Sequence, residues 1–404
     1  MKHFLLVAGM AITALASAQN IQEQDVTFKY VQLPITPIND GTLSYNLTVS
    51  MNYLSKNDDS TKNYNAKMDL WRSELGTAMD LWEQEKIKAD KQYYSQLMIW
   101  ETQYNAGNTT AVKPVRTPYP SPNIKPRPKA PMLLLELTPS TIMSGIKLEG
   151  LTQTTTSAVK IELIYEGFER SAIPQMKQSG TAPNIKYYYE VTYRHPVTLK
   201  IDVPGRGLVV NERVPGCDGF RSGRTAEYKT QAELQMYWLE NEKIFWEERQ
   251  RAAINETVAE INNYLNEKVA YPVKSRRAEI RTVKSKDFDY TDLLNAYSSF
   301  QDGALMLQYK DKKSQSKEKF QAAITIWEKA LTESDINDKK ARIDKWVTSA
   351  LYVNLMEAYL WMDDYANAEI YGNKAINMDN KYGRDARDRM AILKFQKERY
   401  MANE

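Results

Sequence analysis

The chain has 404 residues, which is long enough for two or three domains with a substantial buried core. Its 54 basic and 51 acidic residues give a formal net charge of +3, and this near-balance argues against nucleic acid or an anionic membrane as the main partner. The single cysteine excludes an internal disulfide. Stability must therefore come from core packing, for which 8 Trp, 26 Tyr and 9 Phe supply material.

The first 18 residues have the pattern of a signal peptide. Met1–His3 is a short basic start, Phe4–Leu15 is an apolar run shorter than a membrane span, and Ala16–Ala18 matches a small-x-small cleavage site. We expect residues 1–18 to be removed, so that the mature chain begins near Gln19. No cysteine follows the apolar run, so no lipoprotein anchor is expected. The predicted location is the periplasm or the periplasmic face of the outer membrane, without a transmembrane segment.

The mature sequence offers little material for catalysis. His195 is its only histidine, which excludes a His-rich zinc site and would make any Ser-His-Asp or Cys-His triad depend on that residue. It lies between two strand-like runs, where a structural role is more common. Cys217 lies in a Gly-rich turn without an identifiable base, and we interpret it as a surface or half-buried residue. No catalytic residue, metal site or cofactor is predicted.

Alternation of apolar and polar residues predicts a β-rich domain over residues 19–215, built as a sandwich or a mixed sheet. Pro and Gly residues separate most of the strand-like runs. A polar loop is expected over Ser55–Asn63. The predicted strands are Val26–Leu33, Leu43–Leu54, Met132–Leu137, Gly145–Leu151, Ala158–Tyr165, Ile185–Tyr193, Val197–Val203 and Leu208–Val214.

A helical period interrupts this domain over residues 62–106. Apolar residues there recur every three or four positions, which predicts either one long helix or a hairpin of half the length. The stripe weakens around Lys86–Lys88, and this marginally favours a break. Residues 112–131 are rich in proline and are predicted to form an extended connector. The connector is interpreted as a spacer that returns the chain to the sheet, with a docking peptide as the alternative.

Residues 216–285 are predicted to form a long helix and a closing strand. The helix covers Ala226–Val269, and a strand over Ala278–Val283 would complete a β-β-α-β arrangement with the strands before the helix. Two Gly- and Arg-containing segments, Gly205–Gly207 and Gly216–Arg224, have two readings. They are turns between strands, or their backbone N–H groups and arginines cradle an anion.

Residues 286–404 are predicted to be wholly helical, and Ala350–Ala375 carries the clearest pattern. Two short amphipathic runs are joined by a turn at Asp363 and Asp364, and small residues stand where the helices must approach each other. The residues that carry this pattern are Tyr352, Leu355 and Tyr359 on the first face, Ala368, Tyr371 and Ala375 on the second, and Ala323, Trp327 and Ala330 upstream.

This spacing resembles the tetratricopeptide repeat (TPR), over about two repeats. The resemblance implies helical hairpins that bind a protein or peptide along a concave face. The concave-face positions of that family fall on Asn354, Glu357 and Trp361, which share one side of a helix. The reading in which Trp361 only packs against a neighbouring helix stays open.

The sequence therefore predicts an α+β protein, with a β-rich domain that carries a helical insertion and a C-terminal all-α TPR-like array. The expected function is a non-enzymatic adaptor that binds envelope proteins or peptides through the helical groove. The alternative is a carbohydrate- or peptidoglycan-binding module, in which Tyr187 and Tyr189 stack on sugar rings. The Tyr- and Asn-rich, cysteine-poor composition also resembles exported proteins of Bacteroidota.

Overall fold

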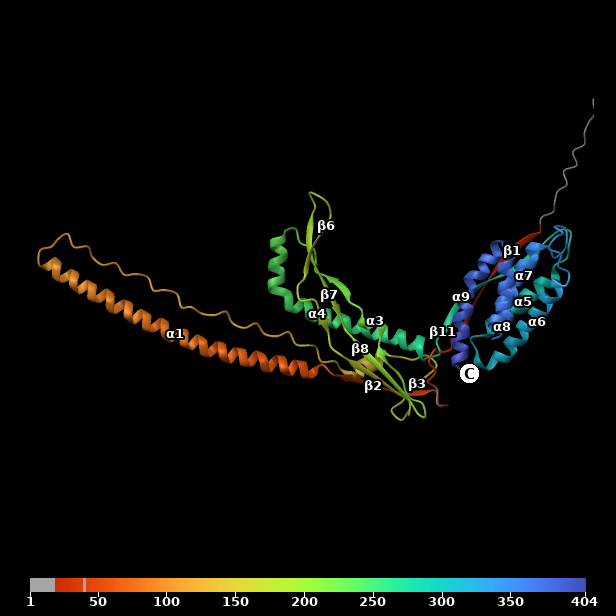
Figure 1. Ribbon diagram of the computed structural model, residues 1–404, viewed down its shortest axis with the longest axis horizontal. Coiled ribbons are helices and arrows are strands. Elements are labelled where there is room, and N and C mark those ends of the chain that lie inside the picture. Colours follow the sequence, from red (N-terminus) through yellow and green to blue (C-terminus); the bar gives the residue numbers. More distant parts are fainter. Residues whose placement is uncertain (1–18, 39–40) are drawn as a thin grey trace, which may run out of the picture.

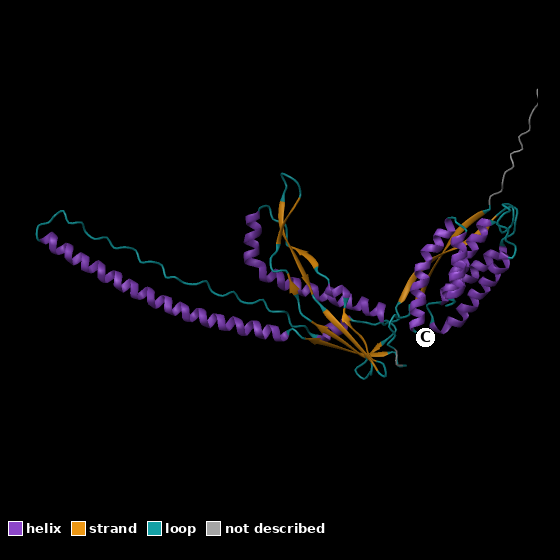
Figure 2. Cartoon of the chain, viewed as in Figure 1, coloured by secondary structure: helices purple, strands orange, loops and turns teal. Residues whose placement is uncertain are grey.

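A computed structural model describes residues 19–38 and 41–404. The predicted signal peptide, residues 1–18, lies outside the described residues. The fold is mixed α+β, with most strands in the N-terminal part and helices in the C-terminal part (Figure 2). Three regions are visible along the chain: a β-domain, a long arm that projects from it, and a C-terminal helical domain (Figure 1).

The β-domain contains a five-stranded and a four-stranded sheet. In the first sheet the strand order is β3-β2-β4-β8-β9; β2 and β4 are parallel, whereas β4, β8 and β9 are antiparallel. In the second sheet β7 pairs with β5, β6 and β10. The strands are β2 (Ser44–Met51), β3 (Thr152–Gln153), β4 (Lys160–Tyr165), β5 (Glu169–Arg170), β6 (Gln175–Ser179), β7 (Lys186–Arg194), β8 (Val197–Val203), β9 (Gly207–Arg213) and β10 (Arg221–Arg224).

Helix α4 (Gln231–Lys268) packs against both sheets. It begins at a capping box, in which the Thr230 side chain accepts a hydrogen bond from the Glu233 backbone and the Glu233 side chain accepts one from the Thr230 backbone. Its C-terminal half buries Ile261 and Leu265 in the core of the five-stranded sheet, and Trp246 packs with the second sheet. Two short helices, α2 (Pro139–Gly145) and α3 (Pro215–Asp218), complete the domain.

The strands predicted over Met132–Leu137 and Gly145–Leu151 are not present. Side-chain amides satisfy the backbone in both segments, so neighbouring strands are not needed. Four backbone N–H groups donate to side-chain amide oxygens at 2.8–3.0 Å: Leu134 to Asn57, Leu135 to Gln250, Lys147 to Asn262, and Glu149 to Asn266.

The arm consists of α1 (Leu54–Asn105) and residues 106–138, which return beside it (Figure 1). This returning segment contains the predicted connector, residues 112–131, and is called the connector below. Helix α1 is a single helix of 52 residues, so the break favoured around Lys86–Lys88 and the loop expected over Ser55–Asn63 were both wrong. At 1.5 Å per residue the helix is about 78 Å long. Most of its side chains contact solvent or the connector, and only Met68 is fully buried.

Three tryptophan side chains of α1 hold the connector. The indole N–H groups of Trp71, Trp82 and Trp100 donate to the carbonyl oxygens of Lys125, Pro120 and Ala111, at 2.9, 2.5 and 2.9 Å. The spacing of these three hydrogen bonds along the two segments follows from the rise per residue of each segment. Trp71 to Trp100 spans about 43 Å of α-helix, and Ala111 to Lys125 spans about the same length as polyproline II, which rises about twice as far per residue. The predicted spacer is therefore an extended strap that follows the helix.

Strand β1 (Asn20–Val31) pairs along its whole length with β11 (Val273–Lys284), in an antiparallel two-stranded ribbon. Both strands pack against the C-terminal helices, and Val26, Phe28, Ala278 and Ile280 belong to the helical core. Two predictions were therefore wrong. Residues 26–33 do not belong to the β-domain, and β11 does not close a β-β-α-β unit. Strand β11 pairs with the N-terminal strand instead, and the ribbon belongs to the helical domain.

The helical domain stacks consecutive antiparallel helices around this ribbon. Asp344, Asp364 and Asn380 cap the N-termini of α7, α8 and α9 with their side chains. Small residues allow close approach: a Cβ added at Gly372 would lie 3.0 Å from the Met356 sulfur. The elements are α5 (Thr291–Met306), η1 (Lys310–Lys312), α6 (Lys313–Leu331), α7 (Lys345–Trp361), α8 (Tyr365–Asn377) and α9 (Lys381–Ala402).

Among the helices in residues 19–38 and 41–404, none combines the length and apolar character needed to cross a membrane.

Candidate functional site

The helix face predicted to bind a partner is covered by the protein's own ribbon. Asn354 on α7 has no exposed surface. Its side-chain oxygen accepts a hydrogen bond from the backbone N–H of Arg281 at 2.8 Å, and its side-chain nitrogen donates to the backbone carbonyl of Arg281 at 2.8 Å. The amide therefore pairs with β11 much as a neighbouring strand would.

Glu357, one turn further along α7, is also completely buried. It forms ion pairs with Arg276 of β11 at 2.8 Å and with Arg389 of α9 at 3.0 Å, and it accepts a hydrogen bond from the Trp361 indole at 2.9 Å. Burial alone would raise the pKa of Glu357, but the two arginine charges outweigh it and the pKa is lowered. The carboxylate is thus a fixed internal charge that joins β11, α7 and α9.

Trp361 packs against the ribbon at its other end. Its ring centroid lies 5.1 Å from that of Phe28 and 4.7 Å from that of Tyr30, and 7% of the residue is exposed. The small exposed part faces a pocket between β1 and the α7–α8 turn. The sequence predicted that Asn354 and Glu357 line an open concave surface. This prediction was wrong, because β11 covers that face of α7.

The two tyrosines proposed for glycan stacking are partly covered. Tyr187 and Tyr189 lie on β7, and both are half-buried. The Tyr189 ring contacts the Trp238 ring of α4 at a centroid distance of 5.2 Å, and Tyr187 is joined to Tyr228 by two backbone hydrogen bonds of 2.8 Å. Further along the same face, Val191 and Tyr193 are buried against α4. The face is therefore mainly a packing surface.

His195 and Cys217 are both buried next to Thr257 of α4. The Nδ1 atom of His195 lies 3.3 Å from the Thr257 hydroxyl, and the Cys217 sulfur lies 3.9 Å from the Thr257 carbonyl oxygen. Burial, with a smaller contribution from Arg221, lowers the pKa of His195 to about 4. Burial raises the pKa of Cys217 to about 12, so the interpretation of this residue as surface or half-buried was wrong. At neutral pH the side chain of His195 is therefore an uncharged imidazole, and that of Cys217 is a protonated thiol.

The Gly- and Arg-containing segments are tied into the fold. Gly205 and Gly207 have φ angles of 76° and 68° in the turn between β8 and β9, a conformation that favours glycine. Arg221 pairs with Glu256 at 2.7 Å and donates to the Gly216 carbonyl at 2.7 Å. The turn reading is confirmed for Gly205–Gly207, whereas Gly216–Arg224 spans the end of α3 and β10 instead of a turn between strands.

Helix α1 of the arm carries more exposed large apolar side chains than any other helix of the described chain. Met98 is 69% exposed and Ile99 is 56% exposed, near the distal end of α1. Between Gln92 and Val112 the only charged residue is Glu101. Other large apolar residues that the arm exposes are Leu70, Met79, Leu81, Ile87, Tyr94, Tyr104, Val112, Val115, Ile124 and Leu133.

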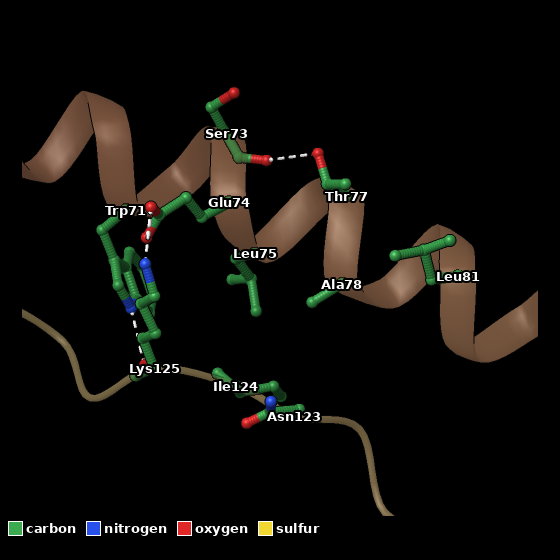
Figure 3. A pocket seen from close by; sticks show the side chains of 10 residues that line it. All are labelled: Trp71, Ser73, Glu74, Leu75, Thr77, Ala78, Leu81, Asn123, Ile124 and Lys125. Carbon is green, nitrogen blue, oxygen red and sulfur yellow. Dashed lines mark hydrogen bonds and ion pairs between the residues drawn. The ribbon is translucent and has the colours of Figure 1, made fainter.

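A shallow hollow of about 270 Å³ lies between α1 and the connector, toward the middle of the arm (Figure 3). Leu75, Ala78 and Leu81 face Asn123 and Ile124 across it (Figure 3). Trp71 and the ion pair between Glu74 and Lys125, at 2.7 Å, close one end. Apolar contacts as well as hydrogen bonds therefore hold the connector to the helix.

The sequence predicted the apolar stripe of α1 that packs on the connector, but not the exposed apolar side chains of Met98 and Ile99. The signal was present in the charge pattern, because the stretch from Gln92 to Val112 carries one charge whereas 26% of the whole chain is charged. Within the described part of the chain, no group of three or more His, Cys, Asp or Glu side chains is placed to hold a metal ion. Comparison with family models, with curated proteins and with solved structures found no match.

Proposed function

We propose that this protein is a non-enzymatic adaptor of the bacterial cell envelope that binds a partner protein through the distal part of its arm. The observation that carries the proposal is the exposure of Met98 and Ile99, in a stretch of sequence from Gln92 to Val112 that carries one charge. This surface lies at the far end of a helix about 78 Å long. A group of exposed apolar side chains on one stretch of a helix is typical of an interaction site.

The connector supports this proposal because it stiffens the arm. An isolated helix with so little buried surface would fray in water. The tryptophan hydrogen bonds, together with the ion pairs of Arg116 with Asp90 at 2.5 Å and Lys125 with Glu74 at 2.7 Å, give α1 a second strand of support along its length. A stiff arm holds its end at a fixed distance from the β-domain, which is what a bridging protein requires.

The helical domain has a different role in this proposal. Its hairpins are TPR-like, but the groove around Asn354 and Glu357 is filled by β11, so the domain supplies a rigid base and the arm makes the contact. Export is supported by the leader-like residues 1–18. The burial of His195 and Cys217 supports a non-enzymatic role, because neither side chain is placed to meet a substrate.

Affinity purification from envelope extracts tests the proposal. Met98→Glu places a charge in the exposed apolar surface and is expected to abolish recovery of a partner that the wild-type protein retains. Met236→Glu is the matched control, because Met236 is an exposed methionine on α4, outside the arm, and this variant should retain the partner. Recovery of the same proteins with all three forms would contradict the proposal, as would recovery of none by the wild type.

A further inference from the structure

A second candidate site lies at the opposite side of the molecule from the arm, in the helical domain. A pocket of about 380 Å³, which we call the junction pocket, opens between the end of β1, the start of α6, the α7–α8 turn and α9. Its volume falls in the range of pockets that hold small ligands. The residues on which the inference rests are Tyr30, Lys310, Trp361, Asp363 and Gln396.

Gln396 of α9 gives the pocket a buried polar group without a partner. The residue is 8% exposed, and its side-chain nitrogen has no hydrogen-bond partner among the described residues. Leaving a buried amide donor unpaired costs about 1–3 kcal/mol. This nitrogen is itself covered, so a rotation of the Gln396 side chain would let it donate to an acceptor oxygen of a ligand in the pocket and remove this cost.

Asp363 occupies a costly position at the edge of the pocket. Its φ angle is 68°, where glycine is normally found, and it follows the C-terminus of α7, where the helix dipole disfavours a negative charge. Its carboxylate lies 3.0 Å from the ammonium groups of both Lys313 and Lys317. These two lysines are thus held over the pocket by a shared counter-charge.

Lys310 is the remaining cation of the lining. It forms no ion pair within the described residues, and its ammonium group lies 4.8 Å from the centroid of the Tyr271 ring. Three ammonium groups and one carboxylate leave the lining with an excess of positive charge. Lys310 is the lysine of the lining without a carboxylate partner, so its ammonium group can pair with a negative group of a ligand, and no arginine is present to bind a phosphate through two hydrogen bonds.

The walls of the pocket are aromatic and apolar. Tyr30 and Trp361 contact each other at a centroid distance of 4.7 Å, and Tyr365, Leu33 and Leu360 continue the surface. Flat ring faces of this type bind apolar or ring-shaped groups by stacking and by removal of water. The pocket therefore combines an apolar body site with a cationic and amide end.

We infer that the junction pocket binds a carboxylate attached to an apolar or ring-shaped body. Lys310 neutralises the carboxylate, Gln396 donates a hydrogen bond to the ligand, and Tyr30 and Trp361 contact its body. The same chemistry is offered by a small free acid and by the C-terminus of a peptide. This inference does not depend on the arm or on the proposed adaptor role.

Calorimetric titration of the full-length mature protein with two matched pairs of probes tests the inference. The first pair is phenylacetate and its neutral amide; the second is an N-acetylated tripeptide ending in phenylalanine, with a free carboxylate or a carboxamide end. In at least one pair, the carboxylate form is expected to bind at least tenfold more tightly than the neutral form, and to weaken as salt is raised. The pair that binds identifies the source of the carboxylate.

Two variants and one control assign the binding to the pocket. Lys310→Gln is expected to weaken carboxylate binding about tenfold, whereas Lys312→Gln removes the same charge two residues away, outside the lining, and should change it less than twofold. Gln396→Leu should weaken binding without lowering the thermal midpoint, because its amide nitrogen has no partner to lose. Equal binding of charged and neutral probes, no binding at millimolar concentration, or equal effects of Lys310→Gln and Lys312→Gln would overturn the inference.

Discussion

The side-chain amide of Asn354 on α7 pairs with both backbone groups of Arg281 on β11, through two hydrogen bonds of 2.8 Å. Strand β1 pairs with one edge of β11, and Asn354 pairs with the other. The helical domain therefore binds a strand of its own chain in the place where a partner was expected. This contact also explains why residues near the N-terminus fold with the last third of the chain.

Asn354→Leu should lower the free energy of unfolding by about 2–4 kcal/mol, because it leaves a buried N–H and a buried carbonyl of Arg281 without partners. Urea denaturation measures the loss. Asn373→Leu, at an exposed position of α8, is the control and should change stability by less than about 0.5 kcal/mol. Equal stability of the two variants would show that the amide does not hold β11.

Glu357→Gln should destabilise the protein by about 3–5 kcal/mol at neutral pH, because Arg276 and Arg389 lose their buried counter-charge. Since the pKa of Glu357 is lowered in the folded state, its contribution is present above the unfolded pKa of about 4.3 and is lost as pH falls through the folded pKa. The difference between wild type and variant should therefore shrink in acid.

Urea denaturation at a series of pH values measures this difference. Glu369→Gln provides the control, because Glu369 forms a half-exposed ion pair with Lys397 at 3.5 Å and should contribute less than about 1 kcal/mol. A difference between wild type and Glu357→Gln that stays constant from pH 7 to pH 3 would contradict the assignment.

The sequence predicted the helices of the C-terminal domain correctly, but not that β11 covers the face of α7 that was expected to bind a partner. The period of residues 350–375 identified α7 and α8, and small residues such as Ala368 and Ala375 lie where the helices meet. The pairing of β1 with β11 joins segments about 250 residues apart, and alternation within each strand carries no information on its partner. The register of the repeat resemblance placed Glu357 on an open concave face, and only the positions of Arg276 and Arg389 explain its burial.

The sequence predicted that the arm contains a helix and an extended connector, but not that the helix is unbroken and that the connector lies along it. The helical stripe and the proline-rich connector were both visible, but the interruption of the stripe around Lys86 and Lys88 suggested a break that does not exist. Patterns within the helix sequence do not show that a distant segment of the same chain binds along the helix and stabilises it. The spacing of Trp71, Trp82 and Trp100 was the available signal, because each indole needs an acceptor and the connector carbonyls lie at matching distances.

His195 should make stability fall as the pH is lowered from about 6.5 to about 4. Its folded pKa, about 4, lies below the usual value of 6.5, so the unfolded chain takes up a proton in this range and the folded chain does not. A shift of this size corresponds to about 3 kcal/mol. His195→Gln should remove that dependence, as measured by urea denaturation between pH 7.5 and pH 4. Parallel curves for the two proteins would contradict the neutral, buried state of His195.

Replacement of Trp71, Trp82 and Trp100 together by phenylalanine should release the connector, because the rings remain but the three N–H donors are lost. Cleavage by trypsin after Arg116, which is paired with Asp90 in the folded arm, should become about tenfold faster or more. Trp346→Phe is the control, since Trp346 is exposed and lies on α7. An unchanged cleavage rate would show that the indoles do not fasten the connector.

Site-specific photo-crosslinking in living cells tests the central claim most directly. A photoreactive amino acid at Met98, at the distal end of the arm, should capture a defined envelope protein, whereas the same group at the exposed Lys62, near the base, should not. Capture at both positions, capture at neither, or capture only of a second copy of this chain at Met98 would contradict the account.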